Sequence, residues 1–157
     1  MRAKRTVTVL SSDIRPALPN ETIRFTHKNR KNMKPEYKPF VDALIELAIR
    51  EDIGDGDHTS LCCIPATEKG RMRLLCKQEG ILAGIEIAQL VLRRLDPEMQ
   101  FEQILRDGDR VKPGDVAFYV SGRLQSLLQA ERILLNIMQR MSGVATQTAV
   151  YADKIKD

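Results

Sequence analysis

A short acidic segment is the first place in this sequence where chemistry could occur. Asp52, Asp55 and Asp57 lie close together and are followed by His58, and carboxylates and imidazoles can bind divalent cations. An EF-hand calcium loop needs a glutamate at its twelfth position, however, and the twelfth residue counted from Asp52 is Cys63. No second histidine lies nearby to complete a zinc site. Since glycines alternate with these aspartates, the segment is interpreted as a turn, and no metal site is predicted.

The three cysteines offer thiol chemistry, but their arrangement argues against it. Cys62 and Cys63 are adjacent in sequence, so they could pair with each other only in a strained disulfide. Neither lies at a helix start that would stabilise a thiolate, and Cys76 alternates with apolar residues, so packing roles are predicted for all three. A reducing cytoplasm fits this pattern, and no signal peptide is expected because no apolar segment follows the basic start.

A phosphate-binding cradle is not found. Gly54-Asp55-Gly56 is not followed by a helical pattern, and the sequence contains no Gly-Lys-Ser or Gly-Lys-Thr. A self-contained nucleotide site is therefore not expected.

Arg132 is the most informative charged residue. It lies in a segment whose helical pattern is apolar on two sides, and a guanidinium in such a place needs a carboxylate partner. Spacing alone favours a structural salt bridge with a neighbouring acid, and the same interpretation applies to Arg140.

The elements that must position these residues can be predicted from hydrophobic periodicity. A helix over 39–52 would bury Phe40, Leu44 and Leu47, with Val41 and Ile45 widening the stripe. A loop of about a dozen residues follows, as its Gly, Asp and Pro content indicates. Alternation then predicts a strand at 72–76, in which Met72, Leu74 and Cys76 face the core. The remaining predicted elements are a helix over 85–95, strands at 101–105 and 116–120, a helix over 124–141, a break at Ser142-Gly143, and a helix over 144–155.

This order of elements favours an α+β domain with a mainly antiparallel sheet covered by helices. The helix over 124–141 carries two apolar stripes, which indicates that it is packed on both sides. Residues 1–32 contain Pro16 and Pro19 and lack a period that could bury a face, so they are predicted to be a disordered basic extension. The organised domain is therefore expected to span 33–157.

Composition and charge exclude several classes of protein. The chain has 157 residues, of which 43% are hydrophobic and 29% charged, and this composition can bury one ordinary core. No apolar stretch approaches the roughly 20 residues needed to cross a bilayer, so no membrane partner is expected. The net charge is +4, but residues 1–32 hold eight basic and two acidic residues, which leaves the rest of the chain net acidic. Nucleic-acid binding is therefore not expected.

Four segments of this sequence resemble one enzyme family in their residues, order and spacing. They are Glu51–Ser60, Glu79–Gly84, Asp107–Gly114 and Ala130–Thr146. The resemblance runs almost continuously over 34–157 and is to the amino-terminal domain of quinolinate phosphoribosyltransferase, also called nicotinate-nucleotide pyrophosphorylase (carboxylating).

The resemblance implies a fold and an activity. The fold would be an open-faced α+β sandwich, and the enzyme would be a pentosyltransferase of NAD biosynthesis. It would transfer phosphoribose from phosphoribosyl pyrophosphate to quinolinate, release CO₂ and pyrophosphate, and form nicotinate mononucleotide. Mg²⁺ would accompany the pyrophosphate, since a departing polyanion needs cations. Arg132 matches the arginine that reaches into a partner subunit's site to hold quinolinate.

The resemblance also implies a second domain and a partner. The family continues into an α/β barrel that carries most of the active site, and this sequence contains no counterpart of it, so catalytic residues are expected on that barrel. The chain would then act as a homodimer or with a barrel-domain partner. Without the barrel, the helix over 124–141 would expose a large apolar patch, and the chain is expected to dimerise or aggregate.

Two other functions remain open. A stand-alone module could bind small dicarboxylates or regulate a full-length relative through Arg132, without catalysis. The turn at Asp107–Asp115 also resembles lipoyl or biotinyl carrier domains, but these display a lysine at a hairpin tip, and no such lysine is predicted here.

Overall fold

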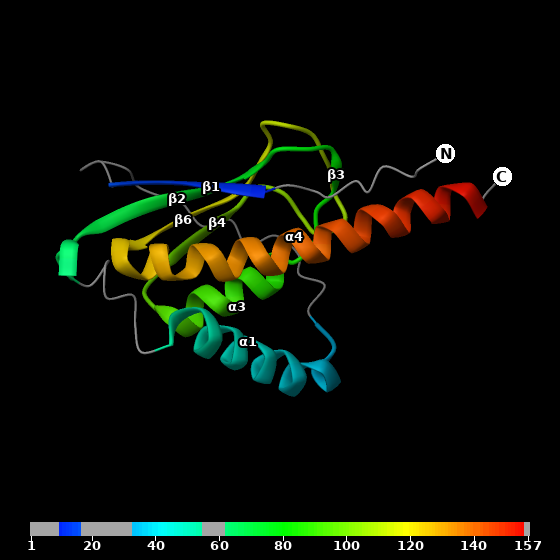
Figure 1. Ribbon diagram of the computed structural model, residues 1–157. Coiled ribbons are helices and arrows are strands. Elements are labelled where there is room, and N and C mark those ends of the chain that lie inside the picture. Colours follow the sequence, from blue (N-terminus) through cyan, green and yellow to red (C-terminus); the bar gives the residue numbers. More distant parts are fainter. Residues whose placement is uncertain (1–9, 17–32, 55–61, 156–157) are drawn as a thin grey trace.

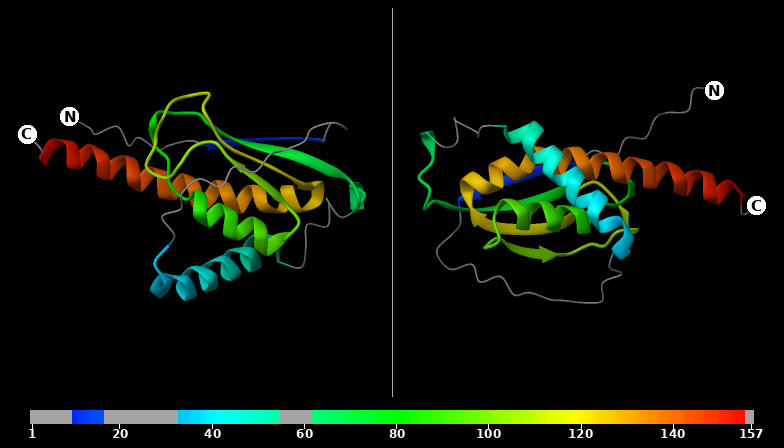
Figure 2. Two further views of the ribbon diagram at one scale, coloured as in Figure 1. Left: turned by 180° about the vertical axis from the view of Figure 1, so that it is seen from behind. Right: turned by 90° about the horizontal axis from the view of Figure 1, so that it is seen from below.

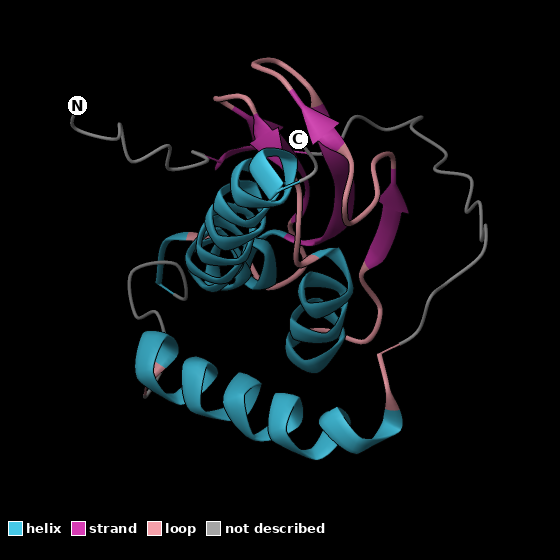
Figure 3. Cartoon of the chain, turned by 90° about the vertical axis from the view of Figure 1, so that its right-hand side faces the viewer, coloured by secondary structure: helices cyan, strands magenta, loops and turns pink. Residues whose placement is uncertain are grey.

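The computed structural model describes residues 10–16, 33–54 and 62–155 (Figure 1). Its strands are β1 (Leu10–Pro16), β2 (Lys69–Cys76), β3 (Gly80–Ile81), β4 (Gln100–Gln103), β5 (Arg110–Val111) and β6 (Val116–Arg123). Its helices are the short 3-10 helix η1 (Pro35–Tyr37), α1 (Lys38–Ile53), α3 (Ile85–Leu95) and α4 (Leu124–Ile155). Figures 1 and 3 show three layers, with α3 and α4 on one face of the main sheet and α1 beneath these two helices.

The main sheet is antiparallel throughout, in the order β1-β2-β6-β4. Alternate residues of β2 are buried, and Met72 and Leu74 stand opposite Val120 and Phe118 of β6. These side chains form the centre of the core, because residues two apart in a strand point to the same face. The predicted strand at 72–76 and its core-facing residues are confirmed.

The other face of the main sheet carries charged and aromatic side chains. Arg71 lies over the Tyr119 ring, 4.3 Å from its centroid, and its guanidinium is 3.7 Å from the Glu102 carboxylate. Arg73 pairs with Asp13 of the neighbouring strand at 2.7 Å. The described residues place no helix on this face, so the fold is the open-faced α+β sandwich that was predicted.

Helix α4 corrects the predicted break at Ser142-Gly143, because the helix is continuous over 32 residues. The Ser142 hydroxyl donates to the carbonyl of Ala83 and accepts from its amide, so it does not compete with the backbone of its own helix. The Thr146 hydroxyl accepts from the Ile81 amide at 2.8 Å. The two hydroxyls thus attach the segment from β3 to α3 to the helix. None of the described helices is long and apolar enough to cross a membrane.

Gly84 permits the close approach of this segment to α4. Its φ of 105° is one that residues with a side chain rarely adopt, and a Cβ here would lie 3.3 Å from Cγ of Met138. Gly84 therefore serves both the turn into α3 and the packing of that turn against α4.

The predicted disorder of residues 1–32 is wrong for residues 10–16. These form β1, which pairs with β2 along its whole length, from Leu10 opposite Cys76 to Pro16 opposite Gly70. Alternation of Leu10, Ser12 and Ile14 is too short to stand out in sequence, but the edge of β2 supplies hydrogen-bonding partners for it. The other residues of the extension lie outside the described part of the chain.

The prediction for α1 has the correct bounds to within one residue but the wrong face. Phe40, Leu44 and Leu47 are exposed, with 74%, 57% and 56% of their surface accessible. The buried residue is Ile45, and the partly buried Val41 and Ile49 flank it. Val41 and Ile45 were predicted only as the margin of the stripe, and Ile49 was not predicted to be buried. Both stripes are apolar, so periodicity could not decide which one faces the core.

The other predicted elements are confirmed with small shifts. The helix over 85–95 is α3, and the strands at 101–105 and 116–120 are β4 and β6, although β4 already ends at Gln103. The short strands β3 and β5 were not predicted, since two residues cannot establish alternation.

Asp96 fixes the end of β6 from which α4 begins. Its carboxylate is buried and accepts hydrogen bonds from Nε of Arg123 at 2.8 Å and from the amide of Glu98 at 3.1 Å. Burial alone would raise the pKa of Asp96, but these hydrogen bonds and the guanidinium charge outweigh it, so the pKa lies below its usual value. The carboxylate therefore stays ionised and holds Arg123, the residue before α4.

Candidate functional site

Arg132 projects from α4 into solvent. Its neighbours Ala130, Ile133 and Leu134 are buried against the sheet and α3, whereas 77% of the Arg132 side chain is exposed. The 3.6-residue period of the helix produces this difference, because it places Arg132 on the face opposite the core. An arginine kept only to fill the interface between helices would be more deeply covered.

The carboxylate of Asp52 holds Arg132 at its inner nitrogen. Oδ1 of Asp52 lies 3.2 Å from Nε of Arg132, and the Asp52 side chain is only 18% exposed. The expected salt bridge with a neighbouring acid therefore exists, but the acid comes from α1, 80 positions earlier in the sequence, and is not Glu131. Asp52 lies in the last turn of α1, as the predicted helix over 39–52 has it, but it was grouped with the turn aspartates and no partner was predicted for it.

Helix α1 is fixed in place so that Asp52 can reach Arg132. Ile45 is buried in the core. Arg94 of α3 lies 3.0 Å from Glu46 and 3.9 Å from Asp42. These contacts with α3 and α4 set the position of the C-terminal turn of α1.

Helix α4 is attached on its other side to β1. The Ser12 hydroxyl donates to the Glu131 carboxylate, and the side-chain amide of Gln139 donates to the Leu10 carbonyl at 3.0 Å. Glu131 and Arg132 are adjacent in sequence but differ in their contacts. Glu131 attaches the helix to the sheet, whereas Arg132 extends from another face of the helix.

Two further polar residues share the exposed face of α4 with Arg132. Asn136 and Arg140 follow at intervals of four residues and are both exposed. At a rise of about 1.5 Å per residue, the row from Arg132 to Arg140 is about 12 Å long. This row is suited to contact an anionic group, because Arg donors match the geometry of carboxylates and phosphates.

The other sequence candidates do not join this site. Asp55, Asp57 and His58 lie outside the described residues. Cys62 and Cys63 are exposed, so the prediction that they are packed is wrong; the chain turns to the surface after the acidic segment. Cys76 is fully buried, as predicted, and burial raises the pKa of its thiol to about 11, which keeps it protonated near neutral pH.

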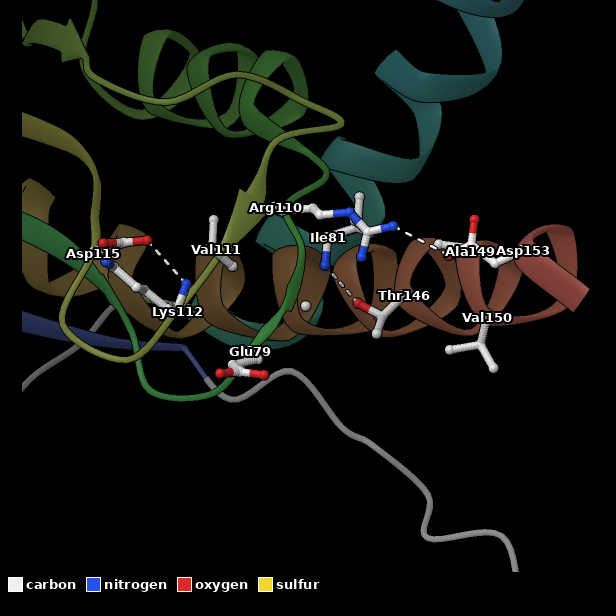
Figure 4. A pocket seen from close by; sticks show the side chains of 11 residues that line it. Glu79, Ile81, Arg110, Val111, Lys112, Asp115, Thr146, Ala149, Val150 and Asp153 are labelled. Carbon is white, nitrogen blue, oxygen red and sulfur yellow. Dashed lines mark hydrogen bonds and ion pairs between the residues drawn. The ribbon is translucent and has the colours of Figure 1, made fainter.

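A pocket of about 580 Å³ lies at the other end of the molecule, between the β3–β5 pair and the C-terminal half of α4 (Figure 4). Its charged residues nearly cancel, since Arg110 and Lys112 face the acids Glu79, Asp115 and Asp153. Arg110 is already paired with Asp153 at 3.2 Å. The pocket therefore does not favour a polyanion, and Arg132 is not among the residues that line it.

Neither a carrier lysine nor a metal cluster is formed by the described residues. Lys112 follows β5, but β5 and β6 pair with different strands and make no hairpin that would display a lysine. Within residues 10–16, 33–54 and 62–155, no three His, Cys, Asp or Glu side chains gather closely enough to bind a metal ion.

Sequence reasoning missed Asp52 as the partner of Arg132, although a signal was present. A carboxylate in the last helical turn faces the negative end of the helix dipole, which disfavours it unless a cation lies nearby. An unfavourably placed acid of this kind indicates a partner elsewhere in the fold.

Comparison with known proteins gives a consistent result. The family model for the N-terminal domain of quinolinate phosphoribosyl transferase matches residues 57–142. Quinolinate phosphoribosyltransferase [decarboxylating] 1 of Nicotiana glauca is 41% identical over 124 residues, which are 77% of this chain and 35% of that protein. The chloroplastic nicotinate-nucleotide pyrophosphorylase [carboxylating] of Arabidopsis thaliana is also 41% identical, over 77% of this chain and 36% of its own length.

A solved structure has the same fold. The crystal structure of NadC from Streptococcus pyogenes superimposes with a TM-score of 0.74 at 31% sequence identity, covering 82% of this chain and 45% of that one. The chain thus spans about a third of the length of the curated relatives and less than half of the solved one.

Proposed function

Since this chain belongs to the quinolinate phosphoribosyltransferase family, we propose that it supplies the substrate-covering N-terminal domain of such an enzyme. The complete enzyme would convert quinolinate and phosphoribosyl pyrophosphate to nicotinate mononucleotide, CO₂ and pyrophosphate. The barrel that the family resemblance implies would supply the catalytic groups, because the described residues of this chain form no barrel.

The observation that carries this proposal is the presentation of Arg132. Its guanidinium is exposed, yet it is held at Nε by a largely buried carboxylate. Quinolinate has two carboxylates, and a guanidinium fork binds a carboxylate through parallel N–H donors. Arg132 would bind and orient one carboxylate of the substrate, and the barrel would contact the reacting ring nitrogen and the sugar.

Mg²⁺ belongs to the proposal only as a companion of phosphoribosyl pyrophosphate. No three His, Cys, Asp or Glu side chains gather within the described residues, so we propose that the ion arrives bound to the pyrophosphate. Neutralisation of a departing pyrophosphate would depend on groups outside this domain.

The activity of a mixture of two chains tests the proposal. The purified 157-residue chain is incubated with quinolinate, phosphoribosyl pyrophosphate and Mg²⁺, alone and with the separately expressed barrel region of a relative, and nicotinate mononucleotide is measured. We expect product only in the mixture. Product from the chain alone would show that the active site is placed wrongly here. If neither the chain alone nor the mixture formed nicotinate mononucleotide, the result would contradict the proposed activity and favour the stand-alone binding module.

A partner subunit or barrel domain is also part of the proposal. The expected exposed patch on 124–141 is not present, since Leu127, Leu134 and Met138 are buried. Met141 is the single large apolar residue of 124–141 that is exposed. Exposed apolar residues gather instead along η1 and α1 and in α4 beyond Met141. They are Tyr37, Phe40, Leu44, Leu47, Val144, Val150, Tyr151 and Ile155. Rows of this kind are typical of faces that another protein surface covers.

Substitution of Leu44 tests whether the α1 row associates. The wild-type chain should form dimers or larger species, and Leu44→Glu should shift it toward monomer, because a charge cannot be buried in an apolar contact. Light scattering coupled to size exclusion at several concentrations measures this. The matched control is Ile104→Glu, which places the same charge on an apolar residue that is 50% exposed and lies outside α1. A wild-type chain that is monomeric at all concentrations would refute the association.

The compartment remains a prediction. We propose the cytoplasm from the cysteine pattern, although the name of the Arabidopsis thaliana relative places that protein in the chloroplast. Fluorescence microscopy of the tagged protein in its own cells would show whether it is in the cytoplasm or in an organelle.

A further inference from the structure

We infer that Asp52 is a positioning residue for quinolinate binding, which it serves by fixing the direction of the Arg132 guanidinium. This inference rests on the proposed function and adds a residue to the same site. Asp52 is not expected to touch the substrate.

The first step concerns which nitrogen Asp52 uses. Its Oδ1 lies 3.2 Å from Nε, the nitrogen nearest the side-chain stem. An ion pair on this side of the guanidinium leaves its two terminal amino groups uncovered, and these are groups that form a fork with a carboxylate. Arg132 is 77% exposed in this arrangement, so the pair holds the guanidinium without covering it.

The second step compares Arg132 with two arginines of the described residues whose Nε donates a hydrogen bond to an aspartate. Arg73 is held by Asp13 through both Nε and a terminal nitrogen, at 2.9 and 2.7 Å, and is 35% exposed. Arg123 is held by the buried Asp96 and is 50% exposed. Both connect elements of the sheet and its loops. Arg132 is the most exposed of the three, which fits a group kept available for a ligand.

The third step concerns the cost of placing Asp52 where it is. The carboxylate lies in the last turn of α1, where the helix dipole disfavours negative charge. Its side chain is 18% exposed, so it is also partly desolvated. A neutral side chain there would suit the helix better, and the pairing with Arg132 explains why a carboxylate is present.

Preorganisation is the expected benefit. A free arginine side chain has several rotatable bonds, and ordering it on binding weakens affinity. A guanidinium already fixed by Asp52 loses less freedom when the substrate carboxylate arrives. The effect should therefore fall on quinolinate affinity and not on the affinity for phosphoribosyl pyrophosphate.

The test is Asp52→Asn in the active mixture of this chain and a family barrel. We expect the KM for quinolinate to rise about tenfold, with the KM for phosphoribosyl pyrophosphate unchanged and kcat within about twofold. Adding Asp52→Asn to Arg132→Ala should have no further effect, because the residue acts through the arginine. Asp153→Asn is the matched control, since it removes an ion pair of the same length, 3.2 Å from Arg110, at the other end of the molecule. It should change neither KM.

A second measurement is independent of activity. The Nε–Hε resonance of Arg132, assigned by its loss in Arg132→Lys, should move in Asp52→Asn and stay in Asp153→Asn. An unmoved resonance in Asp52→Asn would overturn the pairing. An unchanged or lower KM for quinolinate, an equal rise of both KM values, or the same rise in Asp153→Asn would overturn the positioning role. An inactive wild-type mixture would instead refute the proposed function, on which this inference depends.

Discussion

Replacing Arg132 with alanine should raise the KM for quinolinate about 100-fold in the active mixture of this chain and a family barrel. The removed group would make charge-assisted hydrogen bonds to a substrate carboxylate, and losing such bonds costs about 1.5–3 kcal/mol. The KM for phosphoribosyl pyrophosphate should change little, because Arg132 is assigned to quinolinate. Initial rates with each substrate varied in turn measure both constants.

The matched control for this prediction is Arg93→Ala. Arg93 is exposed in the last turn of α3 and belongs to no part of the candidate site, so its removal lowers the positive charge of the chain equally. If Arg93→Ala raised the KM for quinolinate as much, the effect would come from bulk charge. Equal losses for the two substrates in Arg132→Ala would refute the specific role of Arg132.

The sequence could predict the elements that lie in the core because their patterns are regular. The alternation at Met72, Leu74 and Cys76 has one interpretation, and β2 agrees with it. Helix α1 has two apolar stripes, and choosing between them requires knowing which surface of α3 and α4 it meets. That information lies in α3 and α4, which begin 32 and 71 positions after the end of α1, and local periodicity does not contain it.

Tertiary contacts also explain the predicted break that is absent from α4. Ser142-Gly143 is unfavourable within a helix, since glycine costs about 1 kcal/mol and serine competes for backbone hydrogen bonds. In this fold the Ser142 hydroxyl is engaged by Ala83, and Thr146 by Ile81, so the helix gains partners that offset the cost. Ser142 and Thr146 are four residues apart and therefore lie on one face of the helix. This spacing could have indicated that the face makes polar contacts with another segment.

In the candidate site, Arg132 could be predicted from the sequence, but its pairing with Asp52 could not. Arg132 was identified from its charge in an apolar helix and from the family resemblance. The pairing of Asp52 with Arg132 was not predicted, because its partner is remote in sequence and the pairing depends on how α1 crosses α4 (Figure 2). Single charges can thus be selected from sequence, but pairs that join separate elements require the fold.

Replacing Phe118 with alanine should destabilise the domain by about 3–5 kcal/mol, the usual cost of emptying a buried aromatic position. Phe118 is fully buried, stands opposite Leu74 and packs against the Phe101 ring at a centroid distance of 4.6 Å. This loss is a large part of the 5–15 kcal/mol by which domains of this size are typically stable. Urea unfolding followed by circular dichroism measures it.

Phe40→Ala is the matched control, because it removes the same side chain from a position that is 74% exposed. At low protein concentration it should change the free energy of unfolding by less than about 0.5 kcal/mol. A loss below about 1 kcal/mol in Phe118→Ala would contradict the assigned core. A large loss in Phe40→Ala that grows with protein concentration would show that a second copy buries this face of α1. The same row would then both stabilise the domain and join it to its partner, and Arg132, held by the last turn of that helix, would lie beside the junction.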